Sequence, residues 1–158
     1  MIAGKEQQIH TKMNGQLSSL SIFMIARIGH LMGKRANRDL AKAGFTLQME
    51  QLPILFTTYF AGEGLMSQQE IANVLQKDKS GVQRSLRTLE RDGYLRIIAD
   101  EVDRRKNLIQ LTPAGRLAVE KVIAQAEQID RQMTTRLTKA EVDAFLATMH
   151  KIAAALEL

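Results

Sequence analysis

Residues 78–95 read DKSGVQRSLRTLERDGYL, and their spacing decides how the rest of the chain is interpreted. Apolar side chains recur at Val82, Leu86 and Leu89, which the three- and four-residue steps of a helix place on one face. The opposite face carries polar and basic side chains, namely Ser80, Gln83, Arg84, Arg87 and Arg91. The stretch therefore predicts a helix with one buried face and one basic, hydrogen-bonding face. Such a face is either an ordinary solvated surface or a surface that reads DNA.

Both ends of this helix carry signals of their own. Asp78 or Ser80 can cap its N-terminus, and Gly93 marks its end. The residues before it, SQQEIANVLQ at 67–76, open on the capping-box pattern Ser-x-x-Glu and predict a shorter helix. Because a four-residue turn separates the two helices, they have the order of a helix-turn-helix.

Beyond Gly93 the period changes from that of a helix to that of strands. YLRII (94–98) and NLIQL (107–111) are short, branched and apolar, and the charged ADEVDRRK (99–106) lies between them. This pattern predicts a β-hairpin with a long polar tip. Residues 77–106 carry nine basic side chains against six acidic ones, and the surplus lies on the helix face and the hairpin tip, where DNA phosphates would lie.

The N-terminal part of the chain predicts two further helices. Residues 1–15 show no clear period and are expected to form an irregular lead-in. An apolar stripe then predicts a long helix from Leu17 to about Ala43, ended by Gly44. The next helix is expected to begin between Thr46 and Met49 and to close at the turn of Gly62 to Gly64. Pro53 is unfavourable inside it, unless the regular helix begins late enough to put Pro53 in or near its first turn.

The C-terminal part predicts two more helices. Thr112 followed by Pro113 is a typical helix start, and Thr138 with Glu141 forms another capping box. We therefore expect a mainly α fold (α+β), namely a winged helix-turn-helix with a small β-hairpin wing and flanking helices.

The composition narrows the class of protein. The chain has 158 residues, of which 45% are hydrophobic, and it has no cysteine, which excludes disulfides, thiolate metal sites and thiol redox chemistry. The net charge of +5 favours a polyanionic partner. The longest uncharged apolar stretch, residues 13–26, is too short to cross a bilayer and lacks a signal-peptide cleavage site. We expect a cytoplasmic protein without membrane contact.

The motifs of enzymes and of cofactor sites are missing from the sequence. It contains no phosphate-binding glycine loop and no His-Glu-x-x-His, and Ser80 with Gly81 begins a helix rather than a nucleophile elbow. The histidines, His10, His30 and His150, are scattered along the chain. We expect neither enzymatic activity, nor a cofactor, nor a metal.

The stretch from 67 to 115, SQQEIANVLQKDKSGVQRSLRTLERDGYLRIIADEVDRRKNLIQLTPAG, resembles the winged-helix core of the MarR family of bacterial transcriptional regulators. Its most specific part is DRRKNLIQLT, similar to the family's wing pattern of Asp, any residue, Arg, five residues and Leu-Thr. That pattern is matched by Asp103, Arg105, Leu111 and Thr112. The resemblance covers roughly residues 46–116. Gly81 departs from it, because the family often has Ser or Thr there, and the glycine removes a possible hydroxyl contact.

For the wing, the resemblance implies contacts in the minor groove of DNA. Arg105 at the tip would enter the groove, where narrow A·T-rich sequences focus negative potential, and Asp103 would orient it. Arg104 and Lys106 would add phosphate contacts.

For the basic helix, the resemblance implies a place in the major groove. Gln83 and Arg84 are assigned to base edges, because an amide and a guanidinium make bidentate pairs with adenine and guanine. The other expected contacts at this helix, mostly with phosphates, come from Lys79, Ser80, Gly81 and Arg87. For each basic side chain, solvation or pairing with a carboxylate is the alternative, as for Arg91 beside Glu90 and Asp92.

The outer helices carry more apolar surface than one small lobe can hide. Together with the resemblance, this surface implies a homodimer that reads a pseudo-palindromic operator in double-stranded DNA. The expected parts are a lead-in and first dimerisation helix at 1–44, a DNA-binding lobe at 45–112 and C-terminal dimerisation helices at 113–158. The alternative is that the apolar stripes pack within one chain.

The resemblance also implies a regulator, most often a repressor relieved by a small aromatic or anionic effector bound between the dimer helices and the lobe. Arg27 and His30 are weak candidates for binding such an effector, and the alternative is that they are ordinary polar residues at a helix junction. A second functional class fits the same fold, namely an architectural DNA-binding or protein-interaction module without sequence preference. Specific binding above bulk DNA would distinguish the two.

Overall fold

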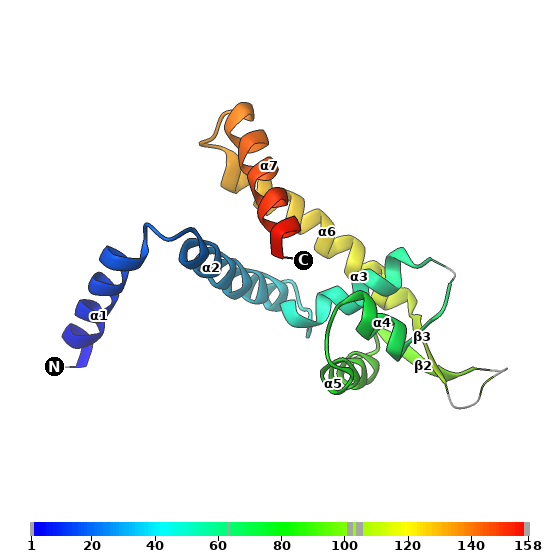
Figure 1. Ribbon diagram of the computed structural model, residues 1–158. Coiled ribbons are helices and arrows are strands. Elements are labelled where there is room, and N and C mark those ends of the chain that lie inside the picture. Colours follow the sequence, from blue (N-terminus) through cyan, green and yellow to red (C-terminus); the bar gives the residue numbers. More distant parts are fainter. Residues whose placement is uncertain (1, 63, 101–102, 104–105, 157–158) are drawn as a thin grey trace.

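The computed structural model describes residues 2–62, 64–100, 103 and 106–156 (Figure 1). Along the chain, a small lobe of short helices and strands is flanked by long helices, and this lobe lies at the lower right in Figure 1. The elements, in chain order, are α1 (Ile2–Leu17), α2 (Ser21–Lys42), a 3₁₀ turn η1 (Met49–Gln51), α3 (Leu52–Phe60), β1 (Met66–Ser67), α4 (Gln68–Val74), α5 (Lys79–Arg91), β2 (Leu95–Ala99), β3 (Asn107–Leu111), α6 (Pro113–Thr134) and α7 (Lys139–Leu156).

The lobe is a winged helix-turn-helix. Its antiparallel sheet has the strand order β1-β3-β2, and Ile97 of β2 pairs with Ile109 of β3. The hairpin of β2 and β3 follows the helix pair α4 and α5 directly. The predicted mainly α fold with a small hairpin is confirmed. The two-residue strand β1 was not predicted, because it is too short to leave an alternating pattern.

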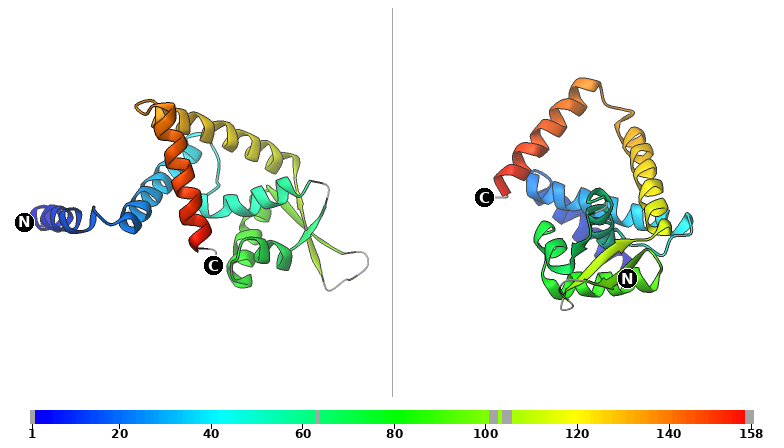
Figure 2. Two further views of the ribbon diagram at one scale, coloured as in Figure 1. Left: turned by 45° about the horizontal axis from the view of Figure 1, so that its top comes forward. Right: turned by 90° about the vertical axis from the view of Figure 1, so that its right-hand side faces the viewer.

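One hydrophobic core holds the lobe together, and its buried side chains all lie between Leu40 and Val122. The side chains of Leu55, Ile71 and Leu89 have no measurable exposure. Helix α6 contributes Ala118, Val119 and Val122 to the same core, so its first half belongs structurally to the lobe. Its second half leaves the lobe, and α7 turns back from its far end toward α2 (Figure 2).

The expectation of an irregular lead-in at residues 1–15 is wrong, because this segment is helix α1. Every described side chain of α1 before Leu17 is exposed, so these side chains form no buried face that would give the sequence a helical period. The long helix α2 begins at Ser21 and not at Leu17. The turn at residues 18–19 separates it from α1, where two serines can compete with helical hydrogen bonds.

The remaining helix starts follow the predicted capping chemistry. The Ser67 hydroxyl accepts from the Glu70 N–H, and the Thr112 hydroxyl accepts from the Gly115 N–H at 3.0 Å. Helix α3 begins at Leu52, later than the predicted start between Thr46 and Met49, because the 3₁₀ turn η1 precedes it, and Pro53 therefore lies in the first turn of α3. Helix α2 ends at Lys42, just before Gly44, whose φ of +82° favours glycine.

Candidate nucleic-acid interface

Helix α5 is anchored to the lobe along one face. Val82, Leu86 and Leu89 are buried in the core. At the N-terminus of the helix, the Asp78 carboxylate accepts a 2.7 Å hydrogen bond from the Gly81 N–H, which makes Asp78 the capping residue. The side chain of Gln68 on α4 donates to the Lys79 carbonyl at 3.2 Å. These contacts fix the start of α5 relative to α4.

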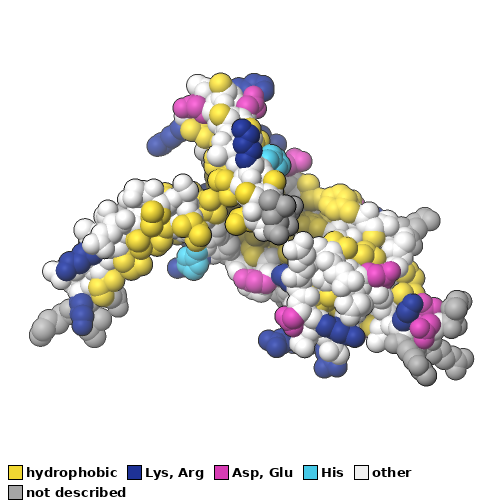
Figure 3. All heavy atoms as spheres, in the orientation of Figure 1, with side chains coloured by type: hydrophobic (Ala, Val, Ile, Leu, Met, Phe, Trp, Pro, Cys, Tyr) yellow, Lys and Arg dark blue, Asp and Glu magenta, His cyan; other side chains and the backbone are white. Residues whose placement is uncertain are grey.

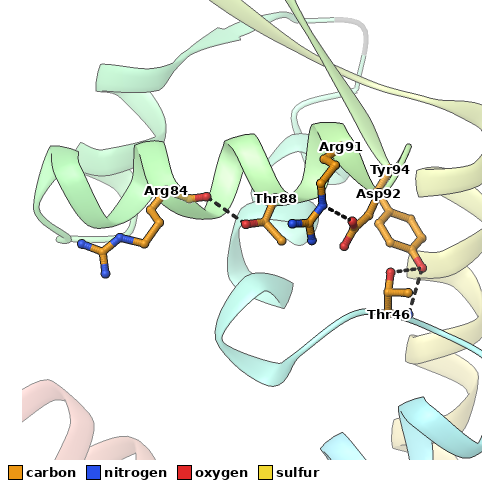
Figure 4. A network of polar contacts seen from close by, with 6 residues as sticks. All are labelled: Thr46, Arg84, Thr88, Arg91, Asp92 and Tyr94. Carbon is orange, nitrogen blue, oxygen red and sulfur yellow. Dashed lines mark hydrogen bonds and ion pairs between the residues drawn. The ribbon is translucent and has the colours of Figure 1, made fainter.

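The opposite face of α5 is exposed and carries the predicted DNA-contacting side chains. Within the part of the chain that the structure describes, Gln83, Arg84 and Arg87 make no side-chain hydrogen bond or ion pair. Figure 4 shows the Arg84 side chain extending from the helix, away from the other labelled residues. Dark blue basic side chains gather on this side of the lobe in Figure 3. The face is therefore open to a ligand.

Gly81 has a structural reason to be glycine. A Cβ at this position would lie 2.9 Å from an oxygen of the Asp78 carboxylate. A larger residue would push against the side chain that caps the helix, so the glycine permits the short capping bond. The helix start therefore presents backbone rather than a hydroxyl at this position.

The wing is a hairpin with an ordered base. The Asp100 N–H donates to the Lys106 carbonyl at 3.0 Å, and the Lys106 N–H donates to the Asp103 carbonyl at 2.8 Å. Asp103 also donates its N–H to the Asp100 carboxylate at 3.3 Å, and its own side chain is half-buried. Lys106 is exposed, whereas the predicted contacts Arg104 and Arg105 lie outside the described residues.

A carboxylate that the sequence did not single out joins α5 to the wing. Glu90 accepts a 2.8 Å hydrogen bond from the Ile97 N–H of β2, an edge strand of the sheet. An edge strand leaves backbone donors without strand partners, and Glu90 satisfies one of them. Glu90 and Ile97 are seven residues apart on different elements, so no local pattern indicates this contact.

The C-terminus of α5 is held by a second polar cluster, shown in Figure 4. The Arg91 Nε lies 2.9 Å from the Asp92 carboxylate, and this hydrogen bond lowers the pKa of Asp92 below its ordinary value of 3.8. The Tyr94 hydroxyl lies 3.3 Å from the Thr46 hydroxyl in the segment that leads from α2 into the lobe. Arg91 is therefore engaged with its neighbour, the alternative that the sequence had left open for it.

The effector candidates Arg27 and His30 lie on exposed turns of α2. Neither lines the open cavity of about 520 Å³ between α2, η1, α3 and α6. The described residues contain no group of three or more His, Asp or Glu side chains that could hold a metal ion. None of the described helices is long and apolar enough to span a membrane.

Comparison with known proteins finds similarity to winged-helix proteins of the MarR family. The model of the MarR family matches residues 43–106. The transcriptional activatory protein BadR of Rhodopseudomonas palustris is 26% identical to this chain over 110 residues, which make up 70% of this chain. The match takes in 62% of BadR, so the chain spans less than two thirds of that relative's length.

Solved structures of similar shape cover most of the chain. The MepR–DNA complex of Staphylococcus aureus matches with a TM-score of 0.75 at 24% identity, over 85% of this chain and 97% of that one. MepR in its DNA-binding conformation gives 0.65 at 25% identity, over 85% and 96%. Wild-type MarR of E. coli in its apo form gives 0.68 at 20% identity, over 84% and 96%. At such low identities the likeness to the complex and to apo MarR shows the fold alone.

Proposed function

We propose that this chain is a MarR-type transcriptional regulator that binds double-stranded DNA sequence-specifically, since the MarR family model matches residues 43–106. The observation that carries the proposal is the two-faced helix α5. One face is buried in the core, and the other presents Gln83, Arg84 and Arg87 without partners in the described part of the chain. In a helix-turn-helix the second helix lies in the major groove, which suits this arrangement.

The contacts divide by chemistry. Gln83 and Arg84 read base edges. The DNA phosphates are bound by Lys79, Ser80 and Arg87, and they pass close to the protein main chain at Gly81. In the wing, Arg105 enters the minor groove with support from Asp103, and Arg104 and Lys106 contact phosphates. An amide such as that of Gln83 is not needed for phosphate binding, so its place on the open face favours a regulator over an architectural protein.

The protein functions as a homodimer on a pseudo-palindromic operator. Helix α7 has no buried residue, and its Phe145 and Leu146 are 54% and 49% exposed. Yellow apolar side chains also run along α1 and α2 in Figure 3. A second copy would cover such surface, because extended exposed apolar patches ordinarily mark interaction sites. In this arrangement residues 45–112 bind DNA, and residues 1–44 and 113–158 join the two copies.

Regulation takes the form of repression relieved by a small effector. The cavity between α2, α3 and α6 supports this proposal, because its walls come from both the lobe and the outer helices. A ligand there shifts DNA binding only if it prefers one separation of the two lobes. Activation is the second candidate, favoured by the name of the activatory relative BadR. Run-off transcription from the protein's own upstream region, with and without the protein, distinguishes the two.

The proposal is tested by titrating a fluorescent duplex from the protein's own upstream region against random DNA of equal length, at two salt concentrations. A regulator should prefer its operator by about a thousandfold, with a steep salt dependence on both duplexes. Equal binding to several upstream duplexes and to random DNA would favour the architectural alternative. Failure to bind any duplex at low salt would contradict the proposed role of α5 and the wing.

A further inference from the structure

The cavity between the lobe and the outer helices has the size of a ligand site. Its volume of about 520 Å³ falls within the range of small-molecule pockets. Leu52 and Phe56 of α3 form one wall, and the other walls come from α2, η1 and α6. The hydrogen bond from the Met49 N–H to the Asn37 side chain, 2.7 Å long, ties α2 to η1 beside it.

The apolar lining of this cavity is rich in flexible side chains. Met32, Met49 and Met133 contribute thioethers from three different elements, and Phe56 contributes an aromatic ring. Methionine side chains are flexible and polarisable, so they adapt to ligands of different outline. An aromatic ring additionally attracts a cation over its face. The lining therefore suits a bulky apolar body.

The charged side chains of the cavity are mostly acidic. The cavity is lined by three acidic residues, Asp39, Glu127 and Asp130, and by one basic residue, Arg35. Arg35 is already engaged, because its Nε lies 3.6 Å from Asp39 and its guanidinium donates to the Gln132 side chain at 2.9 Å.

The remaining carboxylates are not fully balanced. Glu127 lies 3.8 Å from Arg131 in an exposed pair, which contributes little at the surface. The Asp130 carboxylate has no hydrogen bond or ion pair within the described part of the chain. The lining residues thus carry a formal charge of −2, from three carboxylates and one guanidinium.

We propose that this cavity binds a lipophilic organic cation, with its apolar body among the methionines and Phe56 and its charge near Asp130 and Glu127. An anion of the same shape would approach a net negative rim whose guanidinium is already paired, which is unfavourable at short range. The charge of the proposed ligand is therefore opposite to that of the anionic effectors that the resemblance implies. The effect of the ligand on DNA rests on the proposed function, but its binding does not.

Two ions of equal shape and opposite charge provide the test. Calorimetric titration of the full-length protein with tetraphenylphosphonium and with tetraphenylborate compares the signs of charge directly. We expect the phosphonium to bind at least about tenfold more tightly than the borate. The protein's net charge of +5 favours the borate at long range, so a preference for the cation must come from the cavity.

Matched variants locate the site. Asp130→Asn should weaken phosphonium binding by about threefold to fivefold, because it removes one exposed carboxylate at the rim. Asp143→Asn removes another exposed carboxylate, on α7, that is paired with Lys139 and does not line the cavity, so it should leave the affinity unchanged. Equal effects of the two variants would place the phosphonium elsewhere and overturn the proposal.

Two other results would also overturn it, namely borate binding as tightly as phosphonium, or no binding of either ion. Binding of the wild-type protein to its upstream duplex is measured in the same buffer. Normal DNA binding without phosphonium binding refutes the cavity assignment and leaves the proposed function intact. Phosphonium binding with the expected response to Asp130→Asn, but without DNA binding, refutes the proposed function instead.

Discussion

Replacing Gly115 by alanine should destabilise the protein, because this residue lies where α6 leaves the wing. Gly115 is buried, and a Cβ there would lie 1.9 Å from the Tyr94 carbonyl oxygen and 2.9 Å from a methyl group of Leu111. The same carbonyl accepts hydrogen bonds from the Thr112 N–H at 3.1 Å and from the Thr112 hydroxyl at 3.0 Å. The strand end and the helix start must therefore separate to admit one methyl group.

The cost can be estimated from these contacts. Crowding in a packed interior costs about 1–3 kcal/mol. Weakening the two hydrogen bonds to the Tyr94 carbonyl costs about 1 kcal/mol each, whereas alanine returns about 1 kcal/mol of helix propensity. The sum is a loss of about 3 kcal/mol in the free energy of unfolding. For a chain of this length, that loss corresponds to a melting temperature lower by about 6–12 °C.

Thermal unfolding followed by circular dichroism measures this effect, at one protein concentration, since a dimer's melting temperature depends on concentration. Gly29→Ala on α2 is the control, because its added Cβ meets no atom within 4 Å. The control should keep or slightly raise the melting temperature. If Gly115→Ala melts within about 2 °C of wild type, the inference that α6 packs too closely against the Tyr94 carbonyl to admit a methyl group is refuted.

Three further predictions concern the DNA-binding lobe and its acid stability. Arg84→Ala should reduce discrimination at one base pair by about 1–3 kcal/mol, whereas Arg87→Ala should weaken binding to operator and random DNA alike. Binding of both variants to a panel of single-base operator variants distinguishes these effects. Equal binding profiles would refute the assignment of Arg84 to a base and Arg87 to phosphates. Glu90→Ala should lower protection of the Ile97 amide against hydrogen exchange by about 1 kcal/mol, and unchanged exchange would exclude the contact. Hydrogen bonds from the Ser67 amide and hydroxyl lower the pKa of Glu70, and those from Thr138 lower the pKa of Glu141, both below the ordinary value of 4.5. A lowered folded-state pKa gives stability that is present above 4.5 and lost as the pH falls through the lowered value, so the urea midpoint should drop below pH 4.5. Glu70→Gln with Glu141→Gln should flatten that drop, and a curve of unchanged shape would contradict the assignment.

Features encoded by neighbouring residues could be predicted from the sequence. The capping boxes and the two faces of α5 depend on side chains three or four positions apart, and the structure confirms both. Helix α1 was missed for the converse reason, because its described side chains before Leu17 are exposed and form no buried face with a helical period. Helical structure there rests on local propensity alone, which is a weak signal.

Features that depend on how elements pack could not be predicted. The contact of Glu90 with β2 exists because α5 lies against an edge strand, and its sequence spacing fits no motif. Likewise Arg27 and His30 were chosen from the composition of α2, whereas the cavity lining depends on which turns of α2 face α3 and α6. The two candidates lie on turns that do not line it.

The separation of the open face of α5 from the apolar surface of α7 has a genetic consequence. In the proposed homodimer, a subunit carrying Arg84→Ala keeps every side chain of α7 and should therefore still pair with a normal subunit. In a cell that makes both versions, mixed dimers hold only one competent recognition helix and occupy the operator poorly. The mutant allele should therefore be dominant over the wild type, whereas an allele that disrupts pairing through α7 should be recessive.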